Sequence, residues 1–214
     1  SDRPARRQQV AHLPDLLQGA PTRLNLQRGI GYHPNHPDLP CFCDGTLIRT
    51  DQGDRPIENL RPGDLVATRD HGFQRLRWTG RRVHDAARVA DHPDLQPIRI
   101  RAGALGKNLP FADLLVSARH RILIRSVIAL HMFGAFEVLV AARQLLSIEG
   151  IDIANDLNDV SYRYMLFDQH EVTVSNGAET ESLSVGDAAM KSVGLVAHRE
   201  NVANLPTRAT AGHP

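Results

Sequence analysis

The stretch that decides the fold of this 214-residue chain is Cys41-Phe42-Cys43-Asp44-Gly45-Thr46-Leu47-Ile48-Arg49-Thr50. Its second half predicts a β-strand, because residues 46–50 are mostly apolar or β-branched and the turn sequence Gln52-Gly53-Asp54 follows them. A Pro-Gly-Asp turn at 62–64 then leads into another predicted strand at 65–68. The stretch opens with a thiol directly after Pro40, which is where a nucleophile aimed at its own backbone would stand.

Two later motifs add polar residues to strand-like sequence. Ser117 and His120 interrupt an apolar run, since Leu114-Leu115-Val116 precedes them and Ile122-Leu123-Ile124 follows. Near the end, Asp168 and His170 come just before a strand-like segment at 172–174 and an Asn-Gly pair that predicts a hairpin turn. A lone cysteine is more often a small buried hydrophobe than a nucleophile, so the functional interpretation depends on these motifs occurring together.

In this order, the three motifs resemble those of the Hint family, the Hedgehog and intein self-processing domains. The resemblance covers roughly residues 41–190. It implies an all-β fold, a disc or horseshoe of short strands with internal pseudo-twofold symmetry. It also implies that the first cysteine, Cys41, attacks the peptide bond that joins it to Pro40.

The chemistry of that attack explains the residue types. An amide is a poor electrophile, so conversion of the Pro40–Cys41 bond to a thioester needs a thiolate, a polarised carbonyl and a proton for the departing nitrogen. Cys41, Ser117 and His120 can supply these. A nearby imidazole or buried dipole would raise the small fraction of thiolate present at neutral pH. His170 is expected to orient or protonate a group in the site, and Asp168 to hold an imidazole tautomer or act as a base.

The sequence departs from the splicing pattern at its downstream end. Splicing inteins carry a His-Asn pair a few residues after the Asn-Gly turn, and this chain has Glu181 and Ser182 there. Neither side chain can form the succinimide that releases the downstream segment. The chain therefore resembles the bacterial intein-like branch, and we expect N-terminal self-cleavage without splicing. The substrate is the chain's own N-terminal flanking polypeptide, and water or an external thiol or amine resolves the thioester.

Three other hypotheses stay open. Cys43 lies two residues after Cys41 and is either a buried filler or a second thiol that accepts the acyl group or responds to oxidation. His33, His36 and the two cysteines provide four nitrogen and sulfur donors, which is the donor set of a zinc site, although their spacing is unusual for one. The whole domain could also be an inactive Hint-like interaction module.

Composition narrows the class of protein. Hydrophobic residues at 42%, charged residues at 23% and a net charge of +1 are typical of a globular protein and give no electrostatic case for nucleic acid. No apolar run reaches the ~18 residues of a membrane-spanning helix.

We predict no cofactor and no resident metal. The compartment stays open, whether cytoplasmic or secreted as part of a larger bacterial protein. A Cys-x-Cys pair is too close for an unstrained disulfide, and a first residue other than Met suggests a fragment or processed product.

The expected organisation has three parts: an N-terminal flanking segment or linker at 1–40, the Hint-like domain at 41–190, and a partly helical tail at 191–214. Within the domain we expect strands at 73–83, 98–101 and 137–140, with a loop at 85–96. Short helices are expected at 141–146 and 187–203.

Overall fold

The computed structural model describes residues 39–125 and 135–184, and most of its regular elements are short β-strands. Every pairing between named strands is antiparallel. The prediction of an all-β fold is therefore confirmed. The expected helix at 187–203 lies outside the described residues.

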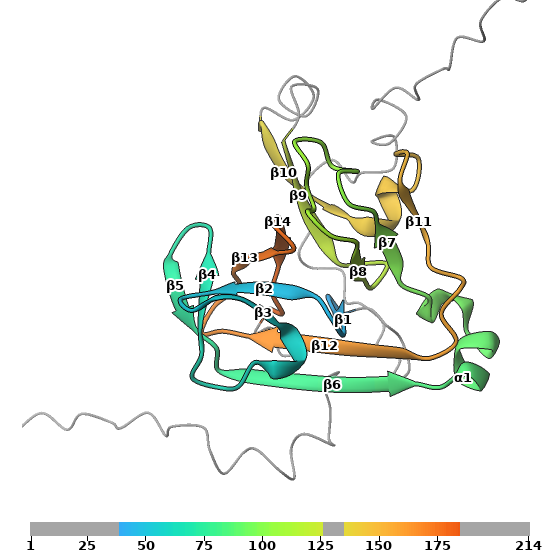
Figure 1. Ribbon diagram of the computed structural model, residues 1–214, viewed down its shortest axis with the longest axis horizontal. Helices are drawn as coiled ribbons and strands as arrows, with labels where there is room; N and C mark the ends of the chain where they lie inside the picture. Colours follow the sequence, from blue (N-terminus) through green and yellow to red (C-terminus); the bar gives the residue numbers. More distant parts are fainter. Residues whose placement is uncertain (1–38, 126–134, 185–214) are drawn as a thin grey trace, which may run out of the picture.

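The first sheet has six strands and contains the segment that begins with the candidate nucleophile. In spatial order the strands are β11 (Ile151–Ile153), β7 (Ile98–Ile100), β8 (Leu114–Val116), β1 (Phe42–Cys43), β12 (Val160–Leu166) and β6 (Trp78–His84). In Figure 1, β6 and β12 run side by side as the two longest strands of this sheet. β1 is an interior strand, with β8 on one side and β12 on the other.

The second sheet has eight strands. Its order is β10 (Glu137–Ala141), β9 (Arg121–Arg125), β14 (Ala178–Glu181), β13 (Val172–Ser175), β2 (Leu47–Thr50), β4 (Leu65–Thr68) and β5 (Gly72–Arg75), with β3 (Gly53–Pro56) paired to β2. β13 and β14 form the predicted hairpin. Asn176 and Gly177 both have positive φ, 47° and 81°, as a tight turn between twisted strands requires.

Two expectations for single segments differ from the structure. The expected strand at 73–83 is two strands, β5 and β6, because Leu76 turns inward between them and is fully buried as the chain passes from one sheet to the other. The expected loop at 85–96 contains α1 (Ala86–Asp91) and the 3-10 turn η3 (Pro93–Leu95). Asp85 caps α1 by accepting a hydrogen bond from the Arg88 backbone, which gives six residues enough support to form a helical turn.

Two other 3-10 turns are η2 (Ile57–Asn59) and η4 (Ala142–Leu145), and η4 confirms the helical turn expected at 141–146.

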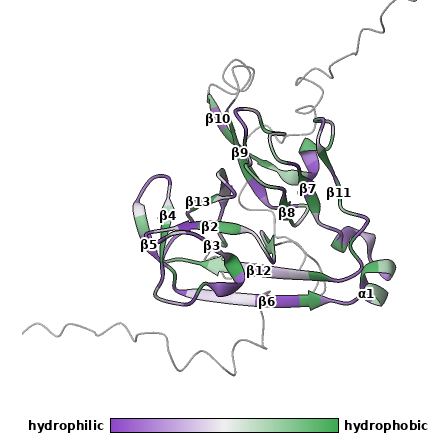
Figure 2. Cartoon of the chain, in the orientation of Figure 1, coloured by the Kyte–Doolittle hydropathy of each residue, from purple (hydrophilic) through white to green (hydrophobic). Residues whose placement is uncertain are grey.

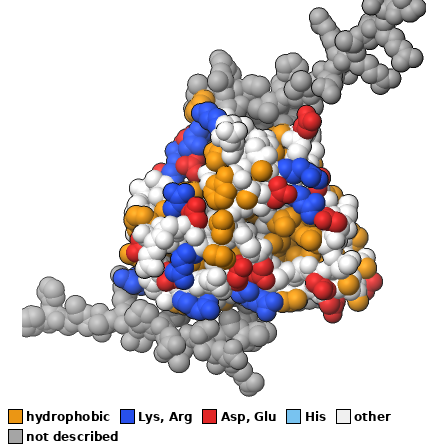
Figure 3. All heavy atoms as spheres, viewed as in Figure 1, with side chains coloured by type: hydrophobic (Ala, Val, Ile, Leu, Met, Phe, Trp, Pro, Cys, Tyr) orange, Lys and Arg blue, Asp and Glu red, His pale blue; other side chains and the backbone are white. Residues whose placement is uncertain are grey.

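One buried cluster fills the space among the strands and includes Phe42, Ile48 and Leu114, while a smaller one surrounds Cys41. In Figure 2 the turn joining β4 to β5 is hydrophilic, as expected for an exposed connection. Acidic and basic side chains intermingle on the face in Figure 3.

Candidate functional site

Cys41 lies immediately before β1 and is fully buried. The strand that follows is held on both sides, because Phe42 pairs with Val116 of β8 and with Arg163 of β12. The Cys41 carbonyl also accepts a hydrogen bond from the Ser117 backbone at 3.0 Å. The candidate nucleophile is therefore fixed by an interior strand rather than carried on a mobile loop.

Ser117 contacts the peptide nitrogen of the predicted scissile bond. Its Oγ accepts a hydrogen bond from the Cys41 N–H at 3.2 Å and donates one to the Leu39 carbonyl oxygen at 2.9 Å. The Cys41 thiol donates to the same Leu39 oxygen at 3.0 Å. A hydroxyl has one proton to donate and lone pairs to accept with, so both bonds of Ser117 can exist together. The residues on the two sides of Pro40 are thus tied to one serine.

His120 contacts the backbone carbonyl of Cys41. Its Nδ1 lies 3.1 Å from the Cys41 carbonyl oxygen, and because that oxygen can only accept, Nδ1 must carry the proton. The ring also packs edge-on against Phe42, with centroids 4.4 Å apart. Burial lowers the pKa of His120 from 6.5 to about 4, so the imidazole is neutral at neutral pH. Its Nε2 is buried without a hydrogen-bond partner among the described residues.

The thiol of Cys41 is also neutral in the resting structure. Burial raises its pKa from 9.0 to about 12, and hydrogen bonding with Tyr164 and Ser117, together with the charge of Arg82, opposes that rise. The groups that favour the thiolate are therefore these three rather than the imidazole we expected. Tyr164 was missed by the sequence analysis, and the only available signal was the Tyr-x-Tyr alternation at 162–164.

Cys43 packs in the same buried cluster as Cys41 and is 6% exposed. Burial raises the pKa of its thiol as well, and the neighbouring Cys41 adds to that effect. Both cysteines are free. These observations fit a neutral thiol that fills space.

His170 and Asp168 lie in different surroundings. Asp168 is 70% exposed on its side chain and forms a two-pronged ion pair with Arg77, at 2.7 to 3.0 Å, with no hydrogen bond to the residues around the thiol. His170 lies 3.3 Å from the carboxylate of Glu181. The structure thus brings Cys41, Ser117 and His120 together but leaves Asp168 on the surface.

Glu181 links His170 to the buried imidazole. It is 2% exposed, accepts hydrogen bonds from the Arg121 backbone at 2.8 Å and from its guanidinium at 2.7 Å, and its charge acts on His120 by raising that pKa. His170 and Arg121 hold the pKa of the Glu181 carboxyl below its usual value against the effect of burial. A buried carboxylate therefore lies where we had noted the loss of a histidine.

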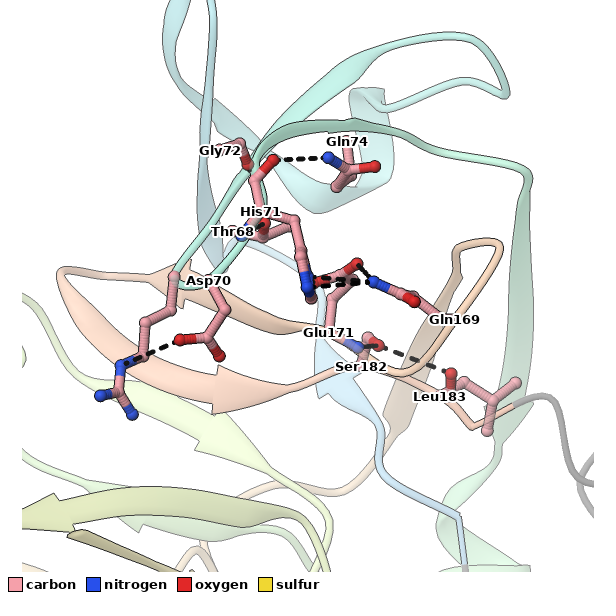
Figure 4. A network of polar contacts seen from close by, with 10 residues as sticks. Thr68, Asp70, His71, Gly72, Gln74, Gln169, Glu171, Ser182 and Leu183 are labelled. Carbon is pink, nitrogen blue, oxygen red and sulfur yellow. Dashed lines mark hydrogen bonds and ion pairs between the residues drawn. The ribbon is translucent and has the colours of Figure 1, made fainter.

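Ser182 and Asn176 are the polar residues at the downstream end whose side chains bear on release of the following segment. The Ser182 hydroxyl accepts from the Glu171 backbone at 2.8 Å, and Figure 4 shows Glu171 in turn contacting His71 and Gln169. The amide of Asn176 is buried and fully used: Oδ1 accepts from the Leu47 backbone, and Nδ2 donates to the carbonyls of residues 112 and 113. Both side chains are therefore held by hydrogen bonds within the domain.

Within residues 39–125 and 135–184, no three His, Cys, Asp or Glu side chains cluster in a way that could hold a metal ion. His33 and His36 lie outside these ranges, so a zinc site that combines them with Cys41 and Cys43 stays a hypothesis. The same part of the chain contains no helix long and apolar enough to cross a bilayer.

Comparison with known proteins places this geometry in a family. A family model described as "Hint domain" matches residues 40–187, which is more than half of the chain. No curated protein matches the sequence. Among solved structures, the chain is similar to an AceL NrdHF class 3 split intein in a splice-inactive variant, at 14% identity and a TM-score of 0.43, covering 68% of this chain and 99% of that one.

It is also similar to the bacterial intein-like domain from Clostridium thermocellum, at 18% identity and a TM-score of 0.42, with 67% of this chain and 98% of that one covered. A variant of the gp41-1 intein gives 14% identity and a TM-score of 0.39, with 66% and 98% covered.

Proposed function

This chain belongs to the Hint domain family, and from that membership we propose a self-processing domain that cleaves its own backbone between Pro40 and Cys41. The nucleophile is the Cys41 thiol and the substrate is the polypeptide that precedes it. Residues 1–40 are the flanking segment that is released, residues 41–190 the processing domain, and residues 191–214 a tail.

The observation that carries this proposal is the position of Ser117. Its hydroxyl binds the nitrogen of Cys41 and the carbonyl of Leu39 at once, so a single side chain clamps the peptide on both sides of Pro40. Proline restricts the backbone at that point as well. A scissile bond that is held in this way is positioned for attack by the adjacent sulfur.

The reaction moves one proton and exchanges one bond. The sulfur of Cys41 loses its proton and forms a C–S bond with the carbonyl carbon of Pro40. The C–N bond to Cys41 breaks, and the nitrogen takes up one proton to become a free amine. Ser117 is the side chain in contact with that nitrogen and is the immediate route for the proton. Water or an external thiol or amine then attacks the thioester and releases the upstream segment.

His120 holds the Cys41 carbonyl while the nitrogen leaves. Its Nδ1–H donates to this carbonyl, and as a neutral imidazole it can also relay a proton to the amine that forms on the same residue. His170 acts through Glu181, whose negative charge favours any transient imidazolium at His120. We assign no part of the reaction to Asp168.

The downstream end stays attached in this proposal. Glu181 is engaged by Arg121 and His170, and the carboxamide of Asn176 is occupied by three backbone groups. Among the described residues near residue 182, no carboxamide nitrogen is therefore free to cyclise. Cleavage at the upstream junction is the expected outcome.

The test is to incubate the folded, reduced chain with dithiothreitol and follow its intact mass. A fragment of residues 1–40 should accumulate, and Cys41→Ala should abolish it while Cys43→Ala should not. Hydroxylamine can replace the thiol, but it also cleaves Asn-Gly pairs, so fragments ending at residue 176 must be told apart by mass. If the wild-type chain stays uncut after prolonged incubation, self-cleavage is refuted.

One observation favours an alternative, an inactive Hint-fold interaction module. Burial holds the pKa of Cys41 at about 12, which leaves very little thiolate at neutral pH. An uncut wild-type chain that stays folded would support this second function.

A further inference from the structure

β12 places two tyrosines opposite the two cysteines. The register pairs Cys43 with Tyr162 and Phe42 with Arg163, so the next position along sets Cys41 opposite Tyr164. Residues directly opposite in an antiparallel pair point to the same face, as do residues two apart on one strand. The four side chains accordingly pack in one buried cluster, while Phe42 packs in the other cluster beside His120. The thiol therefore faces the tyrosines.

The hydroxyls of the two tyrosines face different groups. Tyr162 donates its hydroxyl proton to the Leu95 carbonyl oxygen at 2.9 Å, away from the thiol. Tyr164 is 7% exposed and packs in one cluster with Cys41, and both the Cys41 thiol and Arg82 of the neighbouring strand β6 lie close enough to act on its hydroxyl. A guanidinium can only donate, so Arg82 can act on the phenol oxygen while the phenol keeps its own proton for the sulfur.

We propose that Tyr164, oriented by Arg82, is a further catalytic residue that donates a hydrogen bond to the Cys41 sulfur and stabilises the thiolate as it forms. This inference rests on the proposed self-cleavage. The thiol proton leaves the sulfur toward the departing nitrogen, and the phenol O–H takes its place as the donor facing the sulfur. Burial and the adjacent thiol raise the pKa of Tyr164, so the phenol donates this bond without losing its proton.

The groups that face the thiol explain why a phenol is needed here. Cys43 is neutral, the Ser117 hydroxyl also favours the thiolate but donates its one proton to the Leu39 carbonyl in the resting structure, and Arg82 acts through its charge. Because Cys41 is fully buried, a sulfur anion without a donor is costly there. Tyr164 is the side chain whose hydroxyl the strand register carries to that position.

The first experiment compares thiol-induced cleavage in the wild type, Tyr164→Phe and Tyr162→Phe. Loss of a hydrogen bond to a charged group should slow Tyr164→Phe by about tenfold to a hundredfold and move its rate-pH profile toward alkaline pH. Tyr162→Phe, which removes the hydroxyl of another buried tyrosine, should cleave within about threefold of the wild type. Equal slowing of both variants would overturn the proposal, because it would mean that the tyrosines only support folding.

A second measurement does not depend on cleavage. In protein labelled at the tyrosine Cζ carbon, Cys41→Ala should shift the NMR signal of Tyr164 and leave that of Tyr162 unchanged. An unchanged Tyr164 signal would refute the contact, and with it the proposal. If the wild type does not cleave and Tyr164 still responds to Cys41→Ala, the self-processing function fails while the hydrogen bond stands.

Discussion

Replacing His120 by Asn should make the folded protein markedly less sensitive to mild acid. The imidazole is buried in its neutral form with a pKa of about 4, against 6.5 when it is exposed in the unfolded chain. Between these two values the unfolded chain binds a proton that the folded chain does not. Stability therefore rises with pH through this window and is lost as the pH falls. Asn keeps an N–H donor for the Cys41 carbonyl but does not titrate there.

The size of the effect follows from the two pKa values. Between about pH 7.5 and about pH 5, a shift from 6.5 to about 4 removes roughly 2 kcal/mol of stability. Burial also lowers the pKa of His84, which adds to the loss, whereas the contact with Glu171 raises the pKa of His71 and opposes it. Both of these groups remain in the variant, so the difference between variant and wild type isolates His120.

The assay is urea unfolding at the two pH values, with the free energy extrapolated to water. His120→Asn lowers stability at both values by losing packing against Phe42, but its loss on acidification should be about 2 kcal/mol smaller than that of the wild type. His92→Asn removes an exposed histidine at the end of α1. On acidification this variant should lose the same unfolding free energy as the wild type. If His120→Asn and the wild type lose the same free energy, the imidazole is not buried in its neutral form and the site described above is wrong.

Four further outcomes are expected. Ser117→Ala should slow thiol-induced cleavage by about tenfold or more, because the departing nitrogen loses its hydrogen-bond partner, and unchanged fragment release would contradict this. Above about pH 9, stability should fall as the pH rises, since the folded pKa of Cys41 is raised from 9.0 to about 12, and Cys41→Ala should flatten that fall in alkaline urea titrations. Glu181→Gln should cost about 1 to 2 kcal/mol of unfolding free energy at neutral pH, because a neutral amide weakens the charge-assisted hydrogen bonds from the Arg121 backbone and from its half-exposed guanidinium, and a cost near zero would show that the pair is solvated. A reporter domain fused after Pro214 should stay attached while one fused before Ser1 is released, whereas ligation of the two reporters would return the chain to the splicing class.

The sequence alone determined the features that depend on local geometry. The Asn176-Gly177 pair gave the hairpin because both residues accept positive φ, a property of the residues themselves. The spacing of Ser117 and His120 gave a compact turn, in which the His120 backbone bonds to the Ser117 carbonyl at 3.0 Å. The alternation of apolar residues gave the all-β class. Membership of the Hint family was readable for the same reason, since its motifs are short and local.

The tertiary structure decided what surrounds those motifs. Strand register set Tyr164, more than a hundred residues along the chain, opposite Cys41, and the β14–β9 pairing carried Glu181 to Arg121 and toward His120. The same packing left Asp168 on the surface with Arg77, although its sequence position suggested a place in the site. Burial, charge and pKa depend on contacts between distant segments, and the local residue pattern carries no information about which strand will lie beside which.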